Sequence, residues 1–217
     1  QYRALATTAI RNIVARGHLP LLVGGTGLYV RALLEGWTVP EVPPNASLRQ
    51  ALYDRAKREG PQSLHSQLRK LDPRAAASID ARNVRRVVRA LEVCLETGQP
   101  ISALQERIDP GYRTLMLGLT RPRTELYAAV DARIDRMLAA GLVDEVAGLL
   151  ERGYSPDLPS MSAVGYREIA AFLRGEHSLA EAITLIKRHT RRFVRQQYNW
   201  FRLSDPSIVW LTAADDL

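Results

Sequence analysis

The sequence LPLLVGGTGLYVRALLEG, at residues 19–36, decides the fold of this chain. An apolar run of five residues leads directly into Gly24, Gly25, Thr26 and Gly27, and apolar side chains then return at helical spacing. An unbroken apolar run is typical of a strand buried on both faces of a parallel sheet, and glycines let the backbone turn sharply and approach a ligand. The stretch therefore predicts a strand, a tight loop and a helix.

The loop in this stretch has the composition of an anion site. Backbone amides at such a loop, and at the start of the following helix, attract anions, and Thr26 adds a hydroxyl. The loop matches neither the dinucleotide-binding fingerprint nor the phosphate-binding loop that carries a lysine. The residues alone leave two interpretations open: ligand contact and a plain turn.

The chain is strongly basic. Its 217 residues include 30 Lys or Arg and 23 Asp or Glu, which gives a net charge of +7. This balance favours a polyanionic partner, either nucleic acid or an anionic membrane. No apolar run approaches the length of a membrane span, and the N-terminus lacks the charged and apolar regions of a signal peptide, so we expect no membrane partner and a cytoplasmic location.

Cysteine and histidine offer little chemistry. Cys94 is the only cysteine, and its register with the apolar residues of a predicted helix indicates a buried core thiol rather than a nucleophile. The four histidines show no metal-ligand spacing, and we interpret each as a surface or loop residue; they are His18, His65, His177 and His189. No protein metal ligands are predicted.

The rest of the chain predicts a mixed α/β core with a helical insertion. A proline-rich connector after Gly36 marks a boundary, and the pattern from there to about Asp109 is helical with no strand. We therefore predict an α/β core formed by residues 1–40 and 110–217, and a helical insertion at 41–109. Beyond a helix over 1–17, the core segments are strands at 114–119 and 207–211, helices at 124–152 (interrupted near Gly141) and 162–175, and a final helix opened by a capping box at 178–181.

Two of the predicted helices gather arginines on one face, with no acid among them. A solvated face is the ordinary explanation, and contact with a phosphate backbone is the functional one. For the arginines of the final helix, the aligned positive charges favour nucleic acid. The sets are Arg82, Arg85, Arg86 and Arg89 in the insertion, and Arg188, Arg191, Arg192, Arg195 and Arg202 in the final helix.

Three stretches together resemble one family. LLVGGTGLYVRALLEG at 21–36, SAVGYREI at 162–169 and RRFVRQQYNWFR at 191–202 are similar, in order and separation, to the tRNA dimethylallyltransferases, also called tRNA isopentenyltransferases. The resemblance implies a P-loop-NTPase-like parallel-sheet core, of the nucleotide-binding type, with a helical insertion that binds tRNA. It also implies transfer of a dimethylallyl group from dimethylallyl diphosphate to N6 of the adenine adjacent to the anticodon (position 37), with Mg²⁺ as cofactor.

The resemblance also assigns residues. Thr26 matches the family's substrate-contacting threonine and is the catalytic candidate, while Gly24, Gly25 and Arg123 join it in binding the diphosphate. Ala129 is a departure, because an arginine is more usual there. Positions associated with the anticodon stem-loop of tRNA are Arg49, Arg85, Arg86, Arg89, Ser162, Gly165, Tyr166, Arg167, Arg195, Gln196, Gln197, Asn199 and Arg202.

A larger departure is the lack of two family segments. The family begins with a GxxxxGKT loop and an Asp-Ser segment that carries the general base, and neither occurs here; Lys57, Lys70 and Lys187 have no glycine loop around them. We therefore expect the chain to be a fragment, incomplete at the N-terminus, that retains tRNA affinity and lacks turnover by itself. One pocket and one basic surface require only a monomer.

Two rival functions remain. In an RNA-binding module without catalysis, the arginine helices would act alone and Thr26 would be a turn residue. A nucleotide-kinase-like phosphotransferase has a similar core and an arginine-bearing helical lid, but it gives no reason for the long arginine stripe that ends at Arg202.

Overall fold

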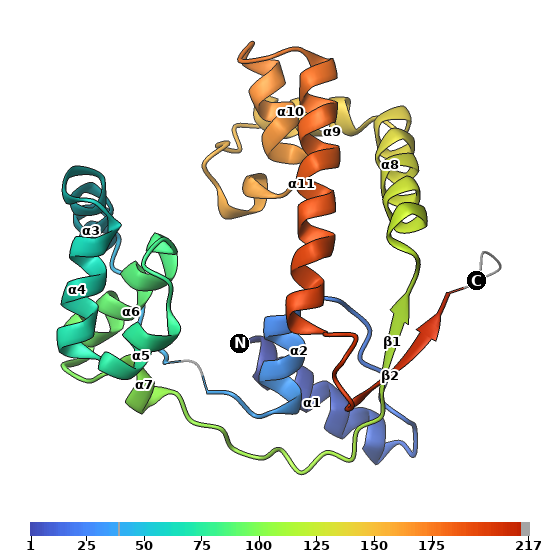
Figure 1. Cartoon of the computed structure of the whole chain (residues 1–217). Coiled ribbons are helices and arrows are strands. Elements are labelled where there is room, and N and C mark those ends of the chain that lie inside the picture. The colour runs from blue at the N-terminus through green and yellow to red at the C-terminus, as the bar shows by residue number, and fades with distance from the viewer. Residues whose placement is uncertain (39, 214–217) are drawn as a thin grey trace. The chain divides into compact units, whose positions relative to one another are not determined.

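The computed structural model describes residues 1–38 and 40–213 (Figure 1). These residues form two compact units. The first contains Gln1–Gly24 and Leu28–Arg113, and the second contains Gly25–Gly27 and the chain from Thr114 onward. The proposed core and insertion boundaries at residues 40/41 and 109/110 stay a prediction.

The first unit opens with two helices, α1 (Tyr2–Ala15) and α2 (Gly27–Leu34). The rings of Tyr2 and Tyr29 stack with their centroids 4.5 Å apart, and Arg3 donates hydrogen bonds to the carbonyls of Gly36 and Trp37. Gly36 has a φ of +63°, and a Cβ there would overlap the carbonyl of Ile108. Glycine is therefore required where the chain leaves α2.

The remainder of the first unit is helical, as predicted. Its core is the apolar face of α6 packed against α3 and α4, with Val87, Leu91 and Val93 fully buried. Asn45, Asp72 and Asn83 cap helix N-termini with their side chains. Cys94 is buried here, as predicted, and burial raises the pKa of its thiol. The helices are α3 (Ala46–Glu59), α4 (Pro61–Leu71), α5 (Pro73–Ser78), α6 (Val84–Thr97) and α7 (Ile101–Leu104).

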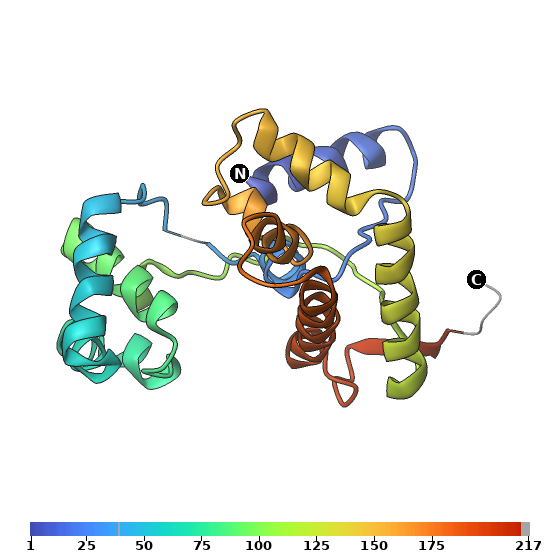
Figure 2. The same ribbon diagram turned by 90° about the horizontal axis from the view of Figure 1, so that it is seen from above.

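The second unit combines a two-stranded parallel sheet with helices. Strands β1 (Met116–Thr120) and β2 (Ile208–Thr212) pair in register, which confirms the strands predicted at 114–119 and 207–211. The long helix α11 (Leu179–Trp200) packs against α8 and α10 (Figures 1 and 2). The other elements are α8 (Arg123–Ala139), α9 (Leu142–Glu151), η1 (Pro159–Ser162) and α10 (Tyr166–Leu173).

Two local signals in this unit behave as predicted. The capping box of α11 forms, because the Ser178 hydroxyl accepts from the Glu181 amide and the Glu181 carboxylate accepts from the Ser178 amide. The helix predicted over 124–152 is broken at Gly141, whose φ of +97° separates α8 from α9. Behind the break, Ile134, Val146 and Ile169 form the centre of the core.

The strand predicted at residues 19–23 is wrong for this structure. The segment has no regular secondary structure, and Leu19, Leu21 and Val23 are exposed. A strand needs a neighbour for its backbone hydrogen bonds, and in the described residues β1 and β2 pair only with each other. No described strand pairs with this apolar run.

Two further predictions need correction. The helix expected over 162–175 begins only at Tyr166, because Gly165 at its N-cap has a φ of +104°. The histidines are not all surface or loop residues, since His65 and His189 are half-buried within helices and hydrogen-bonded. Across the described ranges, none of the helices is both long and apolar enough to cross a membrane.

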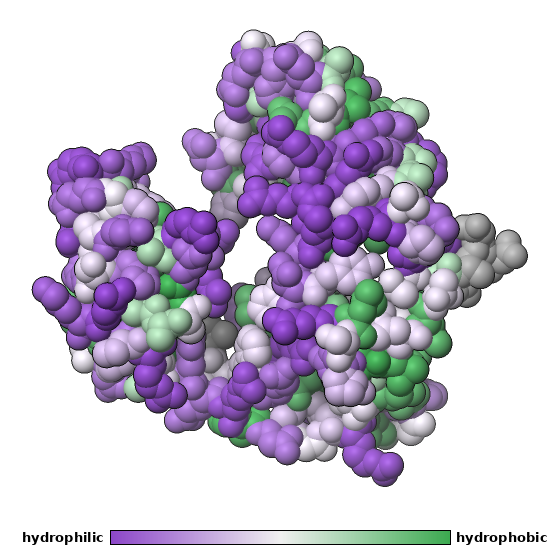
Figure 3. Space-filling view, viewed as in Figure 1, coloured by the Kyte–Doolittle hydropathy of each residue, from purple (hydrophilic) through white to green (hydrophobic). Residues whose placement is uncertain are grey.

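One face of the sheet is apolar and exposed. Leu117 and Leu119 of β1 lie beside Val209 and Leu211 of β2 in the parallel register, and all four are at least 45 % exposed. Figure 3 shows this apolar surface over the β1–β2 pair. On the opposite face of the sheet, the Trp210 ring covers Gly118.

Candidate functional site

The glycine loop of the second unit lies against the end of α11. Gln197 donates a hydrogen bond through Nε2 to the Gly25 carbonyl at 3.2 Å. A Cβ at Gly25 would overlap the Gln197 amide, and a Cβ at Gly27 would overlap the Trp200 side chain. Neither glycine has a positive φ. The loop therefore needs glycine for close approach to α11 rather than for a left-handed turn.

Thr26 lies between these two close contacts and directly before α2. Its side chain is exposed and makes no hydrogen bond to any described residue. Gly24 is also exposed, with open space where a Cβ would be. The loop thus presents a hydroxyl and backbone to solvent while its flanks are held by α11.

The end of α11 also contacts the carboxyl end of β1. The Tyr198 hydroxyl and Thr120 Oγ1 are 3.3 Å apart, and Arg195 donates to the Tyr127 hydroxyl of α8 at 3.3 Å. Arg123 opens α8 three residues after Thr120, as the sequence predicted. One helix end therefore joins the loop and the strand end, which is where α/β folds collect ligands.

The basic face of α11 is partly neutralised by α8. Arg191 forms an ion pair with Asp131, and Lys187 pairs with Asp135 at 2.7 Å. The expectation of aligned arginines without a carboxylate is wrong for Arg191, because its acid comes from another helix. Exposed residues of α11 and its end that make no side-chain hydrogen bond within the described chain are Arg188, Arg192, Gln196, Asn199 and Arg202.

The segment 162–167 is held by polar contacts, of which those to Glu168 are the most buried. Ser162 donates to the Pro159 carbonyl at 2.6 Å, and the Tyr166 hydroxyl bonds to Glu145. Glu168, 2 % exposed, accepts from the Gly165 amide and from Arg167. Burial would raise the pKa of Glu168, but these hydrogen bonds outweigh it and lower the pKa.

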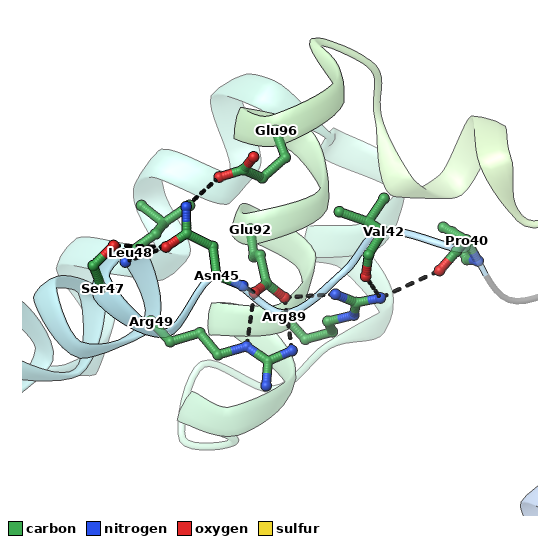
Figure 4. Close-up of polar contacts among 9 residues, drawn as sticks. All are labelled: Pro40, Val42, Asn45, Ser47, Leu48, Arg49, Arg89, Glu92 and Glu96. Carbon is green, nitrogen blue, oxygen red and sulfur yellow. Dashed lines mark hydrogen bonds and ion pairs between the residues drawn. The ribbon is translucent and has the colours of Figure 1, made fainter.

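In the helical part of the first unit a buried glutamate holds two arginines (Figure 4). Glu92 accepts two hydrogen bonds from Arg49 at 2.8 Å, one from Arg89 at 2.6 Å and one from the Asn45 amide. Burial opposes ionisation of Glu92. The hydrogen bonds from Arg49, Arg89 and the Asn45 amide outweigh this effect and lower the pKa of Glu92 to about 2. Arg89 also donates to the carbonyls of Pro40 and Val42.

These contacts correct the arginine face predicted for the insertion. Arg82 pairs with Asp80 and Arg89 with Glu92, so the face does have acids beside it. Only Arg85 and Arg86 of that set are exposed without an ion pair in the described residues. The side chains of Arg49 and Arg89 are 36 % and 31 % exposed, and the cluster with Glu92 carries net positive charge.

The expected Mg²⁺ finds no ready set of protein ligands. Within residues 1–38 and 40–213, no three acidic, histidine or cysteine side chains come close enough to hold a metal ion. Magnesium in phosphate-transferring sites is often held mainly by substrate phosphates and water.

Sequence reasoning missed the residues that hold the candidate site in place. Glu92, Glu168 and Asp131 were not singled out, although Glu92 lies one helical turn after Arg89 and Glu168 lies three residues after the Gly165 N-cap. Those spacings are local signals that could have found the first two. Asp131 lies 60 residues from Arg191, so no local signal links them.

Comparison with known proteins gives the family. The IPP transferase family model matches residues 1–204. A tRNA dimethylallyltransferase of Dehalococcoides mccartyi is 48 % identical over 217 residues, which is all of this chain and 67 % of the relative. One of Thermomicrobium roseum is 55 % identical over 197 residues, covering 91 % of this chain and 60 % of the relative. The chain thus spans roughly two thirds of the length of these relatives.

Solved structures agree. A tRNA isopentenylpyrophosphate transferase of Bacillus halodurans is 39 % identical, with a TM-score of 0.64, over 97 % of this chain and 65 % of that one. A eukaryotic dimethylallyltransferase solved acting on tRNA is 26 % identical, with a TM-score of 0.72, over 99 % of this chain and 56 % of that one. The likeness confirms the predicted α/β fold class. The chain belongs to the IPP transferase family.

Proposed function

We propose that this chain takes part in the transfer of a dimethylallyl group from dimethylallyl diphosphate to N6 of the adenine adjacent to the anticodon (position 37) of tRNA, with release of diphosphate, and that the 217 residues alone lack turnover. The observation that carries the proposal is the exposed Thr26, held between two contacts with α11, Gln197 on Gly25 and Trp200 on Gly27. The names of the relatives support it, since they are tRNA dimethylallyltransferases.

The chemistry sets the demands on the site. The N6 lone pair attacks the allylic carbon, the bond from that carbon to the diphosphate oxygen breaks, and the diphosphate leaves with the bonding electrons. Negative charge therefore grows on the diphosphate, and donors aimed at it stabilise the transition state. The amine gives up a proton to a base, for which this chain offers no residue that matches the family pattern.

We assign the leaving group to the loop and the strand end. The Thr26 hydroxyl and the backbone amides of Gly24 and Gly25 donate to diphosphate oxygens, and Arg123 neutralises their charge. Mg²⁺, held mainly by diphosphate oxygens and water, would add positive charge beside the leaving group. The core is of the nucleotide-binding type. We propose that the protein is a monomer. We also propose that it acts in the cytoplasm, where tRNA is modified.

The RNA is held along the basic residues of both units. Arg49, Arg85, Arg86 and Arg89 contact phosphates from the helical insertion, and the segments 162–167 and 195–202 do so from the second unit. Arg85, Arg86 and Arg202, together with Arg188 and Arg192 of α11, carry most of this role, because they are exposed and make no side-chain hydrogen bond within the described chain. The target adenine leaves its stack to reach the allylic carbon, at a cost that phosphate contacts offset.

The test is mass spectrometry of nucleosides from an unmodified tRNA with adenine beside its anticodon, incubated with dimethylallyl diphosphate and Mg²⁺. It uses the 217-residue chain and a chimera that adds GxxxxGKT and Asp-Ser segments of the family pattern at the N-terminus. We expect N6-dimethylallyladenosine from the chimera only, reduced about 100-fold by Thr26→Ala because a donor to the leaving group is lost.

The other possible outcomes of this experiment distinguish the proposed function from its alternatives. Transfer by the 217-residue chain alone would contradict the expectation that it lacks turnover. RNA binding without product from the chimera would replace the proposal with an RNA-binding module. Preference for ATP over the prenyl diphosphate would favour the phosphotransferase.

A further inference from the structure

Arg167 and Glu168 form a pair whose two sides face different surroundings. The Arg167 side chain is 51 % exposed, whereas that of Glu168 is 2 % exposed. Arg167 donates through Nε and Nη2 to Glu168 Oε1, at 2.8 and 2.5 Å. One edge of the guanidinium is therefore fixed from inside the protein.

Glu168 is in turn held from several elements. Its Oε2 accepts from the Gly165 amide at 2.8 Å, and its Oε1 lies 2.8 Å from His189 Nδ1 of α11. His177 lies 3.2 Å from the Glu168 carbonyl. A carboxylate with this many partners has one orientation, so the turn at Gly165 and the Arg167 side chain are set together.

The outer side of Arg167 faces open space. Arg167, Ser162 and Arg174 line a cavity of about 610 Å³ between the loop before η1 and α10. Asp157 lines it too, and Arg174 is paired with Glu176. A fixed guanidinium at such a rim is suited to a phosphate oxygen, because the fork is already oriented before the ligand arrives.

We infer that Glu168 is a positioning residue for RNA binding: it fixes the Arg167 guanidinium and the Gly165 turn so that Arg167 meets an RNA phosphate at the rim of this cavity. The inference rests on the proposed function, since it assumes that the segment 162–167 meets tRNA.

A test can separate a charge effect of Glu168 from a positioning effect, because the two predict opposite changes in RNA affinity. Glu168→Gln removes a negative charge and releases the Arg167 charge, so charge alone predicts tighter RNA binding. If Glu168 positions Arg167, the same change weakens binding. We expect a loss of about tenfold in affinity for an unmodified anticodon stem-loop RNA, measured by fluorescence anisotropy with the 217-residue chain at fixed salt.

Matched variants separate positioning from stability. Glu176→Gln removes an exposed carboxylate that pairs with Arg174 and should bind RNA at least as tightly as the parent. Arg167→Ala should weaken binding as much as Glu168→Gln, and the double variant should be no weaker than either. Additive losses, or unchanged affinity of folded Glu168→Gln, would overturn the inference.

Two remaining outcomes are decisive as well. If Glu168→Gln does not fold, Arg167→Lys replaces it: the charge stays but the fork is lost, and unchanged affinity would refute the positioning role. If the parent chain does not bind the stem-loop, the proposed RNA surface and this inference fall together. If the parent chain binds the stem-loop and the variants bind it with the same affinity, only this inference is refuted and the proposed RNA surface stands.

Discussion

At the scale of single residues, buried carboxylates organise the described part of the chain. Asp72, Glu92 and Glu168 are at most 2 % exposed. Asp72 is compensated by neutral donors, the amides of Ala75 and Ser102 and the Ser102 hydroxyl, whereas both glutamates hold arginines. A buried charge persists only with such partners, and removing a partner costs more than the pair contributes.

Glu92 should make the helical unit sensitive to acid. Its pKa in the folded chain is about 2, below its ordinary value near 4.5, so its stabilisation is complete above about pH 4.5 and is lost as the pH falls towards 2. We expect Glu92→Gln to lower the free energy of unfolding by about 3 kcal/mol at pH 7 and to remove this acid dependence. Urea titrations from pH 2 to 7 measure both effects.

A control fixes the interpretation of that experiment. Glu41→Gln changes an exposed carboxylate that makes no ion pair in residues 1–38 and 40–213, and we expect its stability to follow that of the parent chain at every pH. Equal acid sensitivity in Glu92→Gln and the parent would show that the arginine cluster does not depend on Glu92.

At the scale of elements, α11 has two kinds of cation on one helix. Arg191 and Lys187 are tied to Asp131 and Asp135 of α8, so they help to join two helices. Arg188 and Arg192 are exposed and have no acid beside them among the described residues. An ion pair already satisfied within the protein gains less from a phosphate than a free cation does.

The two kinds should separate in their salt dependence. Arg188→Ala or Arg192→Ala should each reduce the slope of log affinity against log salt by about 1 for the anticodon stem-loop, because each loses a phosphate contact. Arg191→Ala removes the same charge but should change the slope less and lower the unfolding free energy, because its ion pair with Asp131 is lost. A larger slope change for Arg191→Ala than for the other two would contradict this division.

At the scale of the whole molecule, the described residues contain two separate cores. One is centred on Leu91 in α6, and the other on Val146 and Ile169. No residue belongs to both clusters, and each core belongs to a different unit of the chain. Separate cores allow the units to unfold separately.

We expect two unfolding transitions. Leu91→Ala should destabilise the helical unit by about 3 kcal/mol and shift only one transition, and Ile169→Ala should shift only the other, since each leaves a cavity in one core. Differential scanning calorimetry resolves them. A single transition that both substitutions move equally would show that the units unfold cooperatively as one.

Elements whose signals are local could be predicted from the sequence. The capping box at Ser178, the break at Gly141 and the apolar face of α6 follow from spacing within one or two helical turns, and three motifs gave the family. Only the tertiary structure decided the partners. Arg191 meets Asp131 from 60 residues away, Arg49 meets Glu92 from 43, and Gly25 meets Gln197 from 172. The apolar run at 19–23 predicted burial, but a strand also needs a neighbour, which periodicity does not supply.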